Sequence, residues 1–277
     1  MSAADQLLVV IDPVARRIDG ESVRIAKDVL CAGAQAKICW PEGVEEFSRA
    51  LSRRGARRPV VVGDDLTLLR TVTLLHKERG GAGSRAAGGS RGGPAVAMVP
   101  VGAAASLELA RSLGVPTGAV AAARAVLDGA PRRLDLLVDD GDGVVLGGLR
   151  IPAPPPAPAP AVRAPAPAVW SACRSLVRTL VRAPAPVAAA VAQRLRVEAD
   201  GILLSDAPVT GVSLSGLNGL ARVVVEGRSG ERVCAGAEVV TVTSGEAGFR
   251  YRGDAEQVGG PVRSRTWRVA TWTLTLP

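Results

Sequence analysis

Short apolar runs alternate with segments of helical periodicity along the first half of the chain. Strands are predicted at 7–11, 36–39, 59–62 and 95–100, where the runs are rich in Val, Ile and Leu. Between and after them, apolar residues recur every three or four positions. This spacing predicts helices at 20–32, 42–53, 103–113 and 119–127, with a further helix after the turn at Gly63-Asp64-Asp65. Alternation of strands and helices predicts an open, mostly parallel sheet with helices on both faces.

From Gln193 onward the period changes to two, which is typical of half-buried strands. Asn218-Gly219 separates two such runs, at 212–217 and 221–225, and Asn-Gly at that place is a strong hairpin signal. The C-terminal part is therefore predicted to be an antiparallel β-sandwich or barrel. The fold class is α/β followed by β.

The region between the two patterns predicts a domain boundary. Residues 151–169 are a Pro-Ala repeat, which favours an extended, semi-rigid linker. The predicted domains are 1–150, an α/β nucleotide-binding-like unit, and 170–277, a helix plus a β-sandwich whose last strand could return to the first domain. Residues 80–93 are rich in Gly, Ser and Arg and are predicted to form a surface loop.

A helix is predicted at 170–182, and one of its faces carries arginines at steps of four: Arg174, Arg178 and Arg182. This row suits an anionic lipid surface. It equally suits a core helix with one solvated face.

Composition narrows the class of protein. A hydrophobic content of 47% and a mean hydropathy of +0.22 predict a globular chain, and no apolar run approaches the roughly 20 residues of a membrane span. Asp5 and Asp12 interrupt the apolar start, which argues against a signal peptide, so the expected location is the cytoplasm. The 4 cysteines form no close pairs and His76 is the single histidine, so we expect reduced thiols and neither a zinc site nor a Ser-His-Asp triad.

The formal net charge is +8, and most of the cations are arginine. The composition indicates a GC-rich bacterial genome. Such a genome favours arginine codons, and this bias explains the positive charge as well as an anionic partner would. No basic strip with interleaved aromatic residues is present, so no nucleic-acid partner is predicted.

Candidate chemistry is concentrated at the turn Gly63-Asp64-Asp65, between the third predicted strand and a helix. Open α/β sheets bind ligands outside the carboxyl ends of their strands. A helix N-terminus attracts phosphate, and a carboxylate can hold the accompanying cation.

Several motifs, in this order, resemble the diacylglycerol kinase catalytic family, which is related to the NAD kinases. Val62-Gly63-Asp64-Asp65-Leu66 resembles its Gly-Gly-Asp-Gly-Thr turn. The other matching segments are Asp12-Pro13, Pro100-Val101-Gly102, Ala110-Arg111-Ser112-Leu113-Gly114-Val115-Pro116, Arg133-Leu134-Asp135-Leu136 and Asp254-Ala255-Glu256.

This resemblance implies ATP- and Mg2+-dependent phosphoryl transfer to the hydroxyl of a lipid at a membrane surface. It implies that Asp64, with Asp65, organises Mg2+, that Gly63 and Gly102 allow close approach of the nucleotide, and that Asp254 and Glu256 act near the acceptor. Glu256 would then face Asp64 across a cleft.

Asp12 and Arg16 stand where the family has a glycine-containing phosphate loop. Arg16 and Arg17 could bind phosphate through bidentate hydrogen bonds, or they could be a solvated turn.

The departures from the family pattern favour a second hypothesis. Asp replaces Asn at position 12, a Gly-Gly and a Thr are lost around 62–66, and an Asn-Asp pair is lost near 105. Each lost phosphate donor costs on the order of 10²–10³-fold in rate. The alternative is a catalytically silent relative that binds a nucleotide, a lipid or a partner. Separately, the cluster at 139–143 looks like a Ca2+ loop but is predicted to be a hairpin turn.

Overall fold

A computed structural model of the chain describes residues 6–78, 95–153, 192–245, 248–254, 256–257 and 261–277. The predicted loop at 80–93, most of the predicted linker at 151–169 and the predicted helix at 170–182, with its arginine row, lie outside the described residues.

The first half forms a four-stranded parallel sheet, as predicted. Its strands are β1 (Gln6–Ile11), β2 (Gln35–Cys39), β3 (Arg58–Gly63) and β4 (Ala97–Pro100), in the order β2-β1-β3-β4. β1 and β3 are almost wholly buried, which explains their continuous apolar runs.

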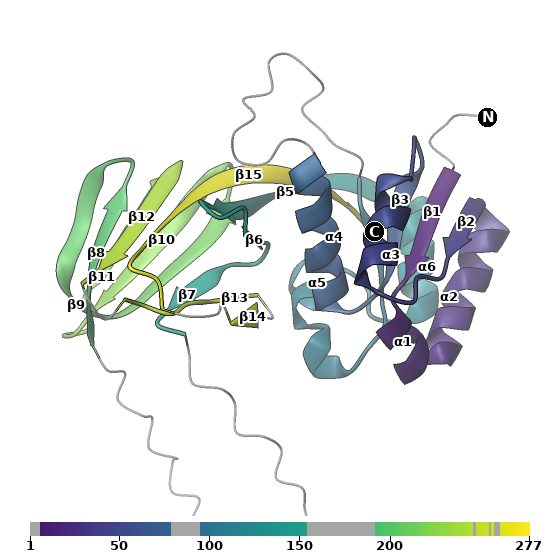
Figure 1. Ribbon diagram of the computed structural model, residues 1–277, viewed down its shortest axis with the longest axis horizontal. Helices are drawn as coiled ribbons and strands as arrows, with labels where there is room; N and C mark the ends of the chain where they lie inside the picture. The colour runs from purple at the N-terminus through teal and green to yellow at the C-terminus, as the bar shows by residue number, and fades with distance from the viewer. Residues whose placement is uncertain (1–5, 79–94, 154–191, 246–247, 255, 258–260) are drawn as a thin grey trace, which may run out of the picture.

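Helices cover both faces of this sheet (Figure 1). Alternate strand residues such as Leu7, Val9 and Val60 pack with α1 (Pro13–Ile18), α2 (Gly20–Gly33) and α6 (Ala119–Asp128). The residues between them, such as Leu8 and Val10, pack with α3 (Val44–Ser52) and α4 (Asp65–Glu78). Successive strand side chains point to opposite faces, so one sheet supports two cores.

The second sheet is antiparallel and has eleven strands. Their bounds are β5 Ala130–Asp139, β6 Val144–Val145, β7 Leu149–Ile151, β8 Gln193–Ala199, β9 Ile202–Leu217, β10 Leu220–Gly227, β11 Arg232–Ala237, β12 Val239–Ser244, β13 Arg252–Gly253, β14 Glu256–Gln257 and β15 Ser264–Leu276. Inward residues from most of them share one core that includes Val197, Val223 and Trp267. The predicted α/β plus β-sandwich layout is confirmed. Asn218 and Gly219, at φ 54 and 80, form the hairpin turn between β9 and β10.

One long ribbon connects the two halves. β5 and β15 pair over ten residues, from Trp267↔Asp139 to Leu276↔Ala130. Figure 1 shows β15 arching from the sandwich to the parallel sheet. There Trp272 and Leu274 join the core beneath α4, and Leu274 bridges to Val96 beside β4. The antiparallel sheet thus begins at Ala130, inside the range predicted as the first domain.

Two segments differ locally from the predictions. The expected phosphate loop after β1 is the helix α1, because the Asp12 side chain caps it by accepting from Val14 N (2.6 Å) and Pro13 occupies its first turn. The expected helix at 103–113 breaks at Leu107 into a 3-10 turn, η3 (Ala104–Ser106), and the short helix α5 (Glu108–Ser112).

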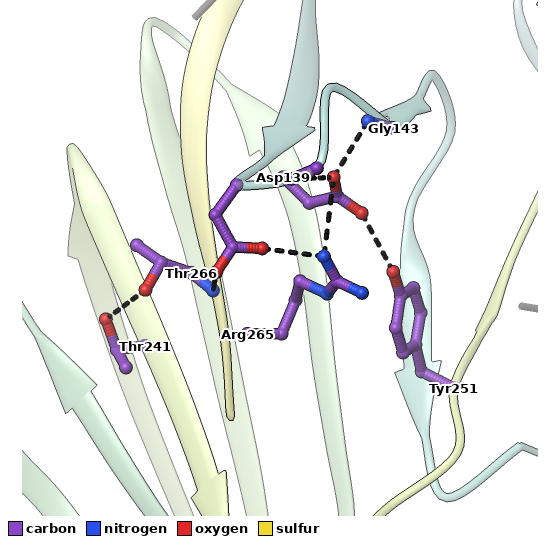
Figure 2. A network of polar contacts seen from close by, with 8 residues as sticks. Asp139, Gly143, Thr241, Tyr251, Arg265 and Thr266 are labelled. Carbon is purple, nitrogen blue, oxygen red and sulfur yellow. Dashed lines mark hydrogen bonds and ion pairs between the residues drawn. The ribbon is translucent and has the colours of Figure 1, made fainter. Parts of the chain in front are cut away.

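The cluster at 139–143 is a hairpin turn between β5 and β6, as predicted. Asp139 Oδ1 accepts from Gly141 N (2.8 Å) and Gly143 N (2.7 Å), and Asp139 Oδ2 accepts from the Tyr251 hydroxyl (2.9 Å). Figure 2 shows this network together with Arg265, which pairs with Asp140 at 2.7 Å. Burial raises the pKa of Tyr251 well above its usual range, so this hydroxyl donates at every physiological pH.

Candidate active site

A cavity of about 910 Å3 lies between the two sheets. Its lining comes from the α4 N-terminus, η3 and α5 on one side, and from the β6–β7 turn, β7, β9 and the β13 segment on the other. The lining residues are Asp64, Asp65, Leu66, Ala103, Ala105, Ser106, Glu108, Leu109, Ser112, Gly147, Gly148, Leu149, Arg150, Ser213, Leu214, Arg252 and Asp254. Two acidic segments far apart in the sequence therefore meet at one cavity, which we call the cleft.

The position of the cleft follows from the parallel sheet. β3 ends at Gly63 and β4 at Pro100, and the turns that follow both strands line the cleft. It thus lies outside the carboxyl ends of parallel strands, where open α/β sheets bind ligands.

Asp64 is the residue immediately before α4 and caps this helix. Its Oδ1 accepts from Thr67 N (3.0 Å), and the Thr67 hydroxyl lies 3.0 Å from the same oxygen. The second carboxylate oxygen, Oδ2, has no hydrogen-bond partner among the described residues. Asp64 thus uses Oδ1 to cap the helix, and its Oδ2 can accept a hydrogen bond or bind a cation in the cleft.

Asp65 is buried, with 3% of its surface exposed, and it anchors α5. Its Oδ2 accepts from Leu109 N (2.8 Å) and its Oδ1 from Ala110 N (2.9 Å). Burial raises the pKa of Asp65, the two amides oppose that rise, and nearby Asp64 adds to it. In the metal-binding role predicted for Asp65, both of its oxygens would also have to keep these amide bonds.

Asp254 lies across the cleft and fixes the β6–β7 turn. It accepts from the backbone amides of Leu146 (2.6 Å), Gly147 (2.7 Å) and Gly148 (3.3 Å). Burial raises the pKa of this carboxyl, the three amides oppose the rise, and the charge of Asp65 contributes to it. Asp65 and Asp254 thus line one cleft from its two sides.

Glu256 follows in β14, where its backbone pairs with Gly253. Its side chain lies outside the described part of the structure.

Asp12 and Arg16 do not line the cleft. Asp12 lies beneath it, buried, with Thr67 Oγ1 at 3.0 Å and Arg70 Nη1 at 3.6 Å. The guanidinium of Arg16 stacks over Trp40, 5.9 Å from the ring centroid. Asp12 is therefore linked to Asp64 through the Thr67 hydroxyl, whereas Arg16 is held against Trp40, which follows the edge strand β2.

Gly63 and Gly102 are explained by packing within the chain. A Cβ on Gly63 would lie 2.6 Å from Thr67 Oγ1, and one on Gly102, where φ is +159, would lie 2.7 Å from Ser106 Oγ. Side chains of the protein thus occupy the space that these glycines leave open. On the Cβ side of either glycine, a nucleotide would therefore meet Thr67 or Ser106.

Two arginines of the cleft were not predicted as site residues. Arg150 in β7 and Arg252 in β13 face each other in register on neighbouring strands, and both line the cleft. Their strands have three and two residues, too short to show a period of two in the sequence. The cleft is thus lined by guanidinium groups along β7 and β13 as well as by carboxylates, which come from α4, α5 and Asp254.

The donor set is compatible with a divalent cation bound jointly by protein and phosphate. Among the described residues, no three His, Cys, Asp or Glu side chains gather closely enough to hold a metal by themselves. Mg2+, however, usually takes only one or two carboxylates and completes its shell with phosphate and water. Asp64 Oδ2 supplies one such oxygen.

The architecture around this cleft occurs in solved structures. A diacylglycerol kinase structure from Bacillus anthracis str. Sterne aligns with a TM-score of 0.68 and 13% identity, covering 100% of this chain and 98% of that one. A second structure from the same organism, assigned as a diacylglycerol kinase, gives a TM-score of 0.70 at 12% identity and covers 100% and 99%. The chain has the diacylglycerol kinase fold.

Yeast NADH kinase, in complex with NADH, shares this kinase fold more distantly. Its TM-score is 0.52 at 11% identity, with 100% of this chain and 84% of that one covered. No protein-family model and no curated protein matches the sequence. At such low identity the likeness establishes the kinase fold, and the chemistry has to be argued from the cleft itself.

Proposed function

We propose that this protein transfers a phosphoryl group from a nucleotide to the hydroxyl of a lipid. The observation that carries this proposal is that Asp64 and Asp254, from the two acidic segments, line one cleft at the carboxyl ends of β3 and β4. Phosphoryl transfer needs positioned donors, neutralised phosphate charge and a proton acceptor, and such a cleft can combine them.

The α4 side of the cleft is the proposed nucleotide site. Asp65 N and Leu66 N belong to the first turn of a 14-residue helix, where backbone amides lack intrahelical partners and attract phosphate. Asp64 would hold Mg2+ through Oδ2, and the ion would supply charge neutralisation for the phosphates. ATP is the proposed nucleotide.

The β13–β14 side is the proposed acceptor site. Asp254 acts there as a positioning residue, because its two oxygens already hold the amides of residues 146–148. Glu256, two positions further along the chain, is proposed to take the proton of the attacking hydroxyl.

The test is a phosphotransfer assay with Mg-ATP and diacylglycerol in mixed micelles, comparing wild type with Asp64→Asn. Asparagine keeps an oxygen that can cap α4, so the fold is expected to be preserved, whereas the anionic ligand is lost. We expect turnover to fall by at least about 10²-fold. Asp19→Asn is the matched control, because Asp19 caps α2 in the same way, with Ser22 N as its donor, outside the cleft. Wild-type turnover by Asp64→Asn would remove Asp64 from the mechanism.

Glu256→Gln examines the acceptor side in the same assay. We expect turnover to fall by about 10²–10⁴-fold, the usual contribution of a general base, with the affinity for Mg-ATP unchanged.

A second candidate function is a non-catalytic relative that binds a nucleotide or a lipid. It is favoured by the amide bonds of Asp65 and Asp254, which engage all four of their carboxylate oxygens in holding backbone. Calorimetry with Mg-ATP separates the two candidates, since binding without turnover on any lipid alcohol would support the silent relative. The described helices are all too short or too polar to span a membrane.

A further inference from the structure

The outer face of the β-sandwich next to the cleft carries a row of aligned side chains. This row consists of one residue from each of five neighbouring strands, in register. They are Arg252 (β13), Arg150 (β7), Ser213 (β9), Val224 (β10) and Cys234 (β11). Their sequence neighbours, such as Leu149, Leu214 and Val223, are buried in the sandwich core, so this row faces outward.

A hollow of about 320 Å3 lies on this face. Ser213, Ser215 and Val224, with their short side chains, line it on β9 and β10, and the longer Arg222 and Arg232 line it as well. Ser213 and Leu214 also line the cleft, so the hollow continues the cleft across the sheet. We call this hollow, with Arg150 at its cleft end, the arginine trough.

The charges of the arginine trough are unbalanced. Glu226 is the one acid in its lining, and it pairs with both Arg150 (3.2 Å) and Arg232 (3.0 Å). Arg222 and Arg252 have no ion-pair partner in the part of the chain that the structure describes. Arg150 and Arg252 are cations on directly opposed strand positions, which is unfavourable in a sheet, and Glu226 pairs with only Arg150 of the two. Guanidinium groups with hydroxyls beside them are the usual protein donors to phosphate.

We propose that the arginine trough binds a phosphate group carried by the acceptor, so that a phosphate-bearing lipid is a better acceptor than neutral diacylglycerol. This inference rests on the proposed function, which places the nucleotide at α4 on the opposite side of the cleft. The trough leads away from α4 across β9 and β10. A molecule with its hydroxyl in the cleft could therefore extend a phosphate toward Arg222.

Calorimetry without nucleotide tests the trough independently of catalysis. The titrants are dihexanoyl phosphatidylglycerol in its monomeric range, dihexanoylglycerol, which lacks the phosphate, and inorganic phosphate. Arg222→Gln is expected to weaken binding of the phospholipid by about tenfold, the loss of one charge-assisted hydrogen bond. Arg24→Gln, on the exposed face of α2, is the control for net charge and should bind as wild type does.

A second variant tests the shape of the trough. Cys234→Trp fills the hollow without changing its charge, and Cys234 is exposed, so the fold should tolerate the larger side chain. It should also weaken binding of the phospholipid, whereas Cys31→Trp, at an exposed position on α2, should not.

The proposal would be supported if inorganic phosphate competes with the phospholipid for wild type and no longer does so for Arg222→Gln. Phosphate would then be the group that the trough recognises. Three results would overturn it: equal affinity for dihexanoylglycerol and the phospholipid, equal losses in Arg222→Gln and Arg24→Gln, or binding only to anionic vesicles and not to monomers. In each case Asp64-dependent turnover on diacylglycerol would leave the kinase proposal intact.

Discussion

The three aspartates of the cleft differ in how many of their carboxylate oxygens accept hydrogen bonds from the backbone. They are Asp64, Asp65 and Asp254. Asp65 and Asp254 use both oxygens on backbone amides, so they stabilise turns and a helix start. Asp64 uses one oxygen to cap α4 and keeps the other available at the cleft. Among these three, Asp64 is therefore the residue with a carboxylate oxygen that accepts no hydrogen bond from the described residues.

The pKa of Asp254 provides a test of distance across the cleft. Burial raises it, and the negative charge of Asp65 raises it further. Asp65→Asn should therefore lower the pKa of Asp254, as followed by carboxyl carbon chemical shifts in an NMR titration. An unchanged Asp254 titration would mean that the two sides of the cleft are too far apart to interact.

The free energy of unfolding should also depend on pH through the carboxyl of Asp254, and the direction of this dependence follows from its raised pKa. A carboxyl whose pKa is raised by folding binds its proton more tightly in the folded state. Its contribution to the free energy of unfolding is therefore largest below the ordinary Asp pKa, about 3.9, and falls as pH rises through the raised value. The difference in stability between wild type and Asp254→Asn should change in that window and be flat above it.

Among the elements, α5 depends most clearly on one distant side chain. It has only five residues, and the amides of Leu109 and Ala110 near its start are satisfied by Asp65 from α4. A helix this short is not stable by itself. The break at Leu107 therefore reflects a tertiary bond that no local pattern in 103–113 reveals.

Asp65→Ala should destabilise the protein by about 2–5 kcal/mol, since it leaves two buried amides without acceptors. Denaturant unfolding measures the loss, and hydrogen exchange at Leu109 and Ala110 should accelerate. Asp28→Ala, on the exposed surface of α2, should change stability by no more than about 0.5 kcal/mol. Unaltered exchange at the two amides would show that α5 is held by packing instead.

At the scale of the molecule, the two sheets are tied through β15. Trp267 lies in the sandwich core, while Leu274 lies in the core beneath α4 with no exposed surface. Damage at either end of this strand is therefore expected to affect both halves.

Leu274→Ala should cost about 2–5 kcal/mol through the cavity it leaves. Because the strand spans both cores, we expect far-UV circular dichroism and tryptophan fluorescence to report one coincident unfolding transition. Val233→Ala, at a half-exposed position on β11, should shift the midpoint far less. Two separated transitions would show that the halves fold independently.

Much of this architecture is predictable from the sequence. Buried strands such as 7–11 and the helices after them are marked by period and by β-branched runs, and Asn218-Gly219 marks its hairpin. The pattern does not reveal that β5 already belongs to the second sheet, because the apolar residues Leu134 and Leu136–Val138 predict a strand but not the sheet that it joins.

The cleft is predictable only in part, and the reason is physical. The order of the acidic motifs indicates which segments to bring together, and Asp64 and Asp254 do line one cavity. Which oxygens remain available depends on amides from distant residues such as Leu146 and Leu109, and that pairing has no local sequence signal. Arg150 and Arg252 are missed because two- and three-residue strands carry no period.

The paired ribbon of β5 and β15 has a mechanical consequence for the cleft. This connection between the halves is a ladder of ten paired residues, which resists stretching and shear but can bend and twist. Closing the halves around a bound molecule would therefore flex a continuous β-ribbon, with elastic recoil favouring the resting width. The size of the bound molecule would then determine how far the β5–β15 ribbon has to bend.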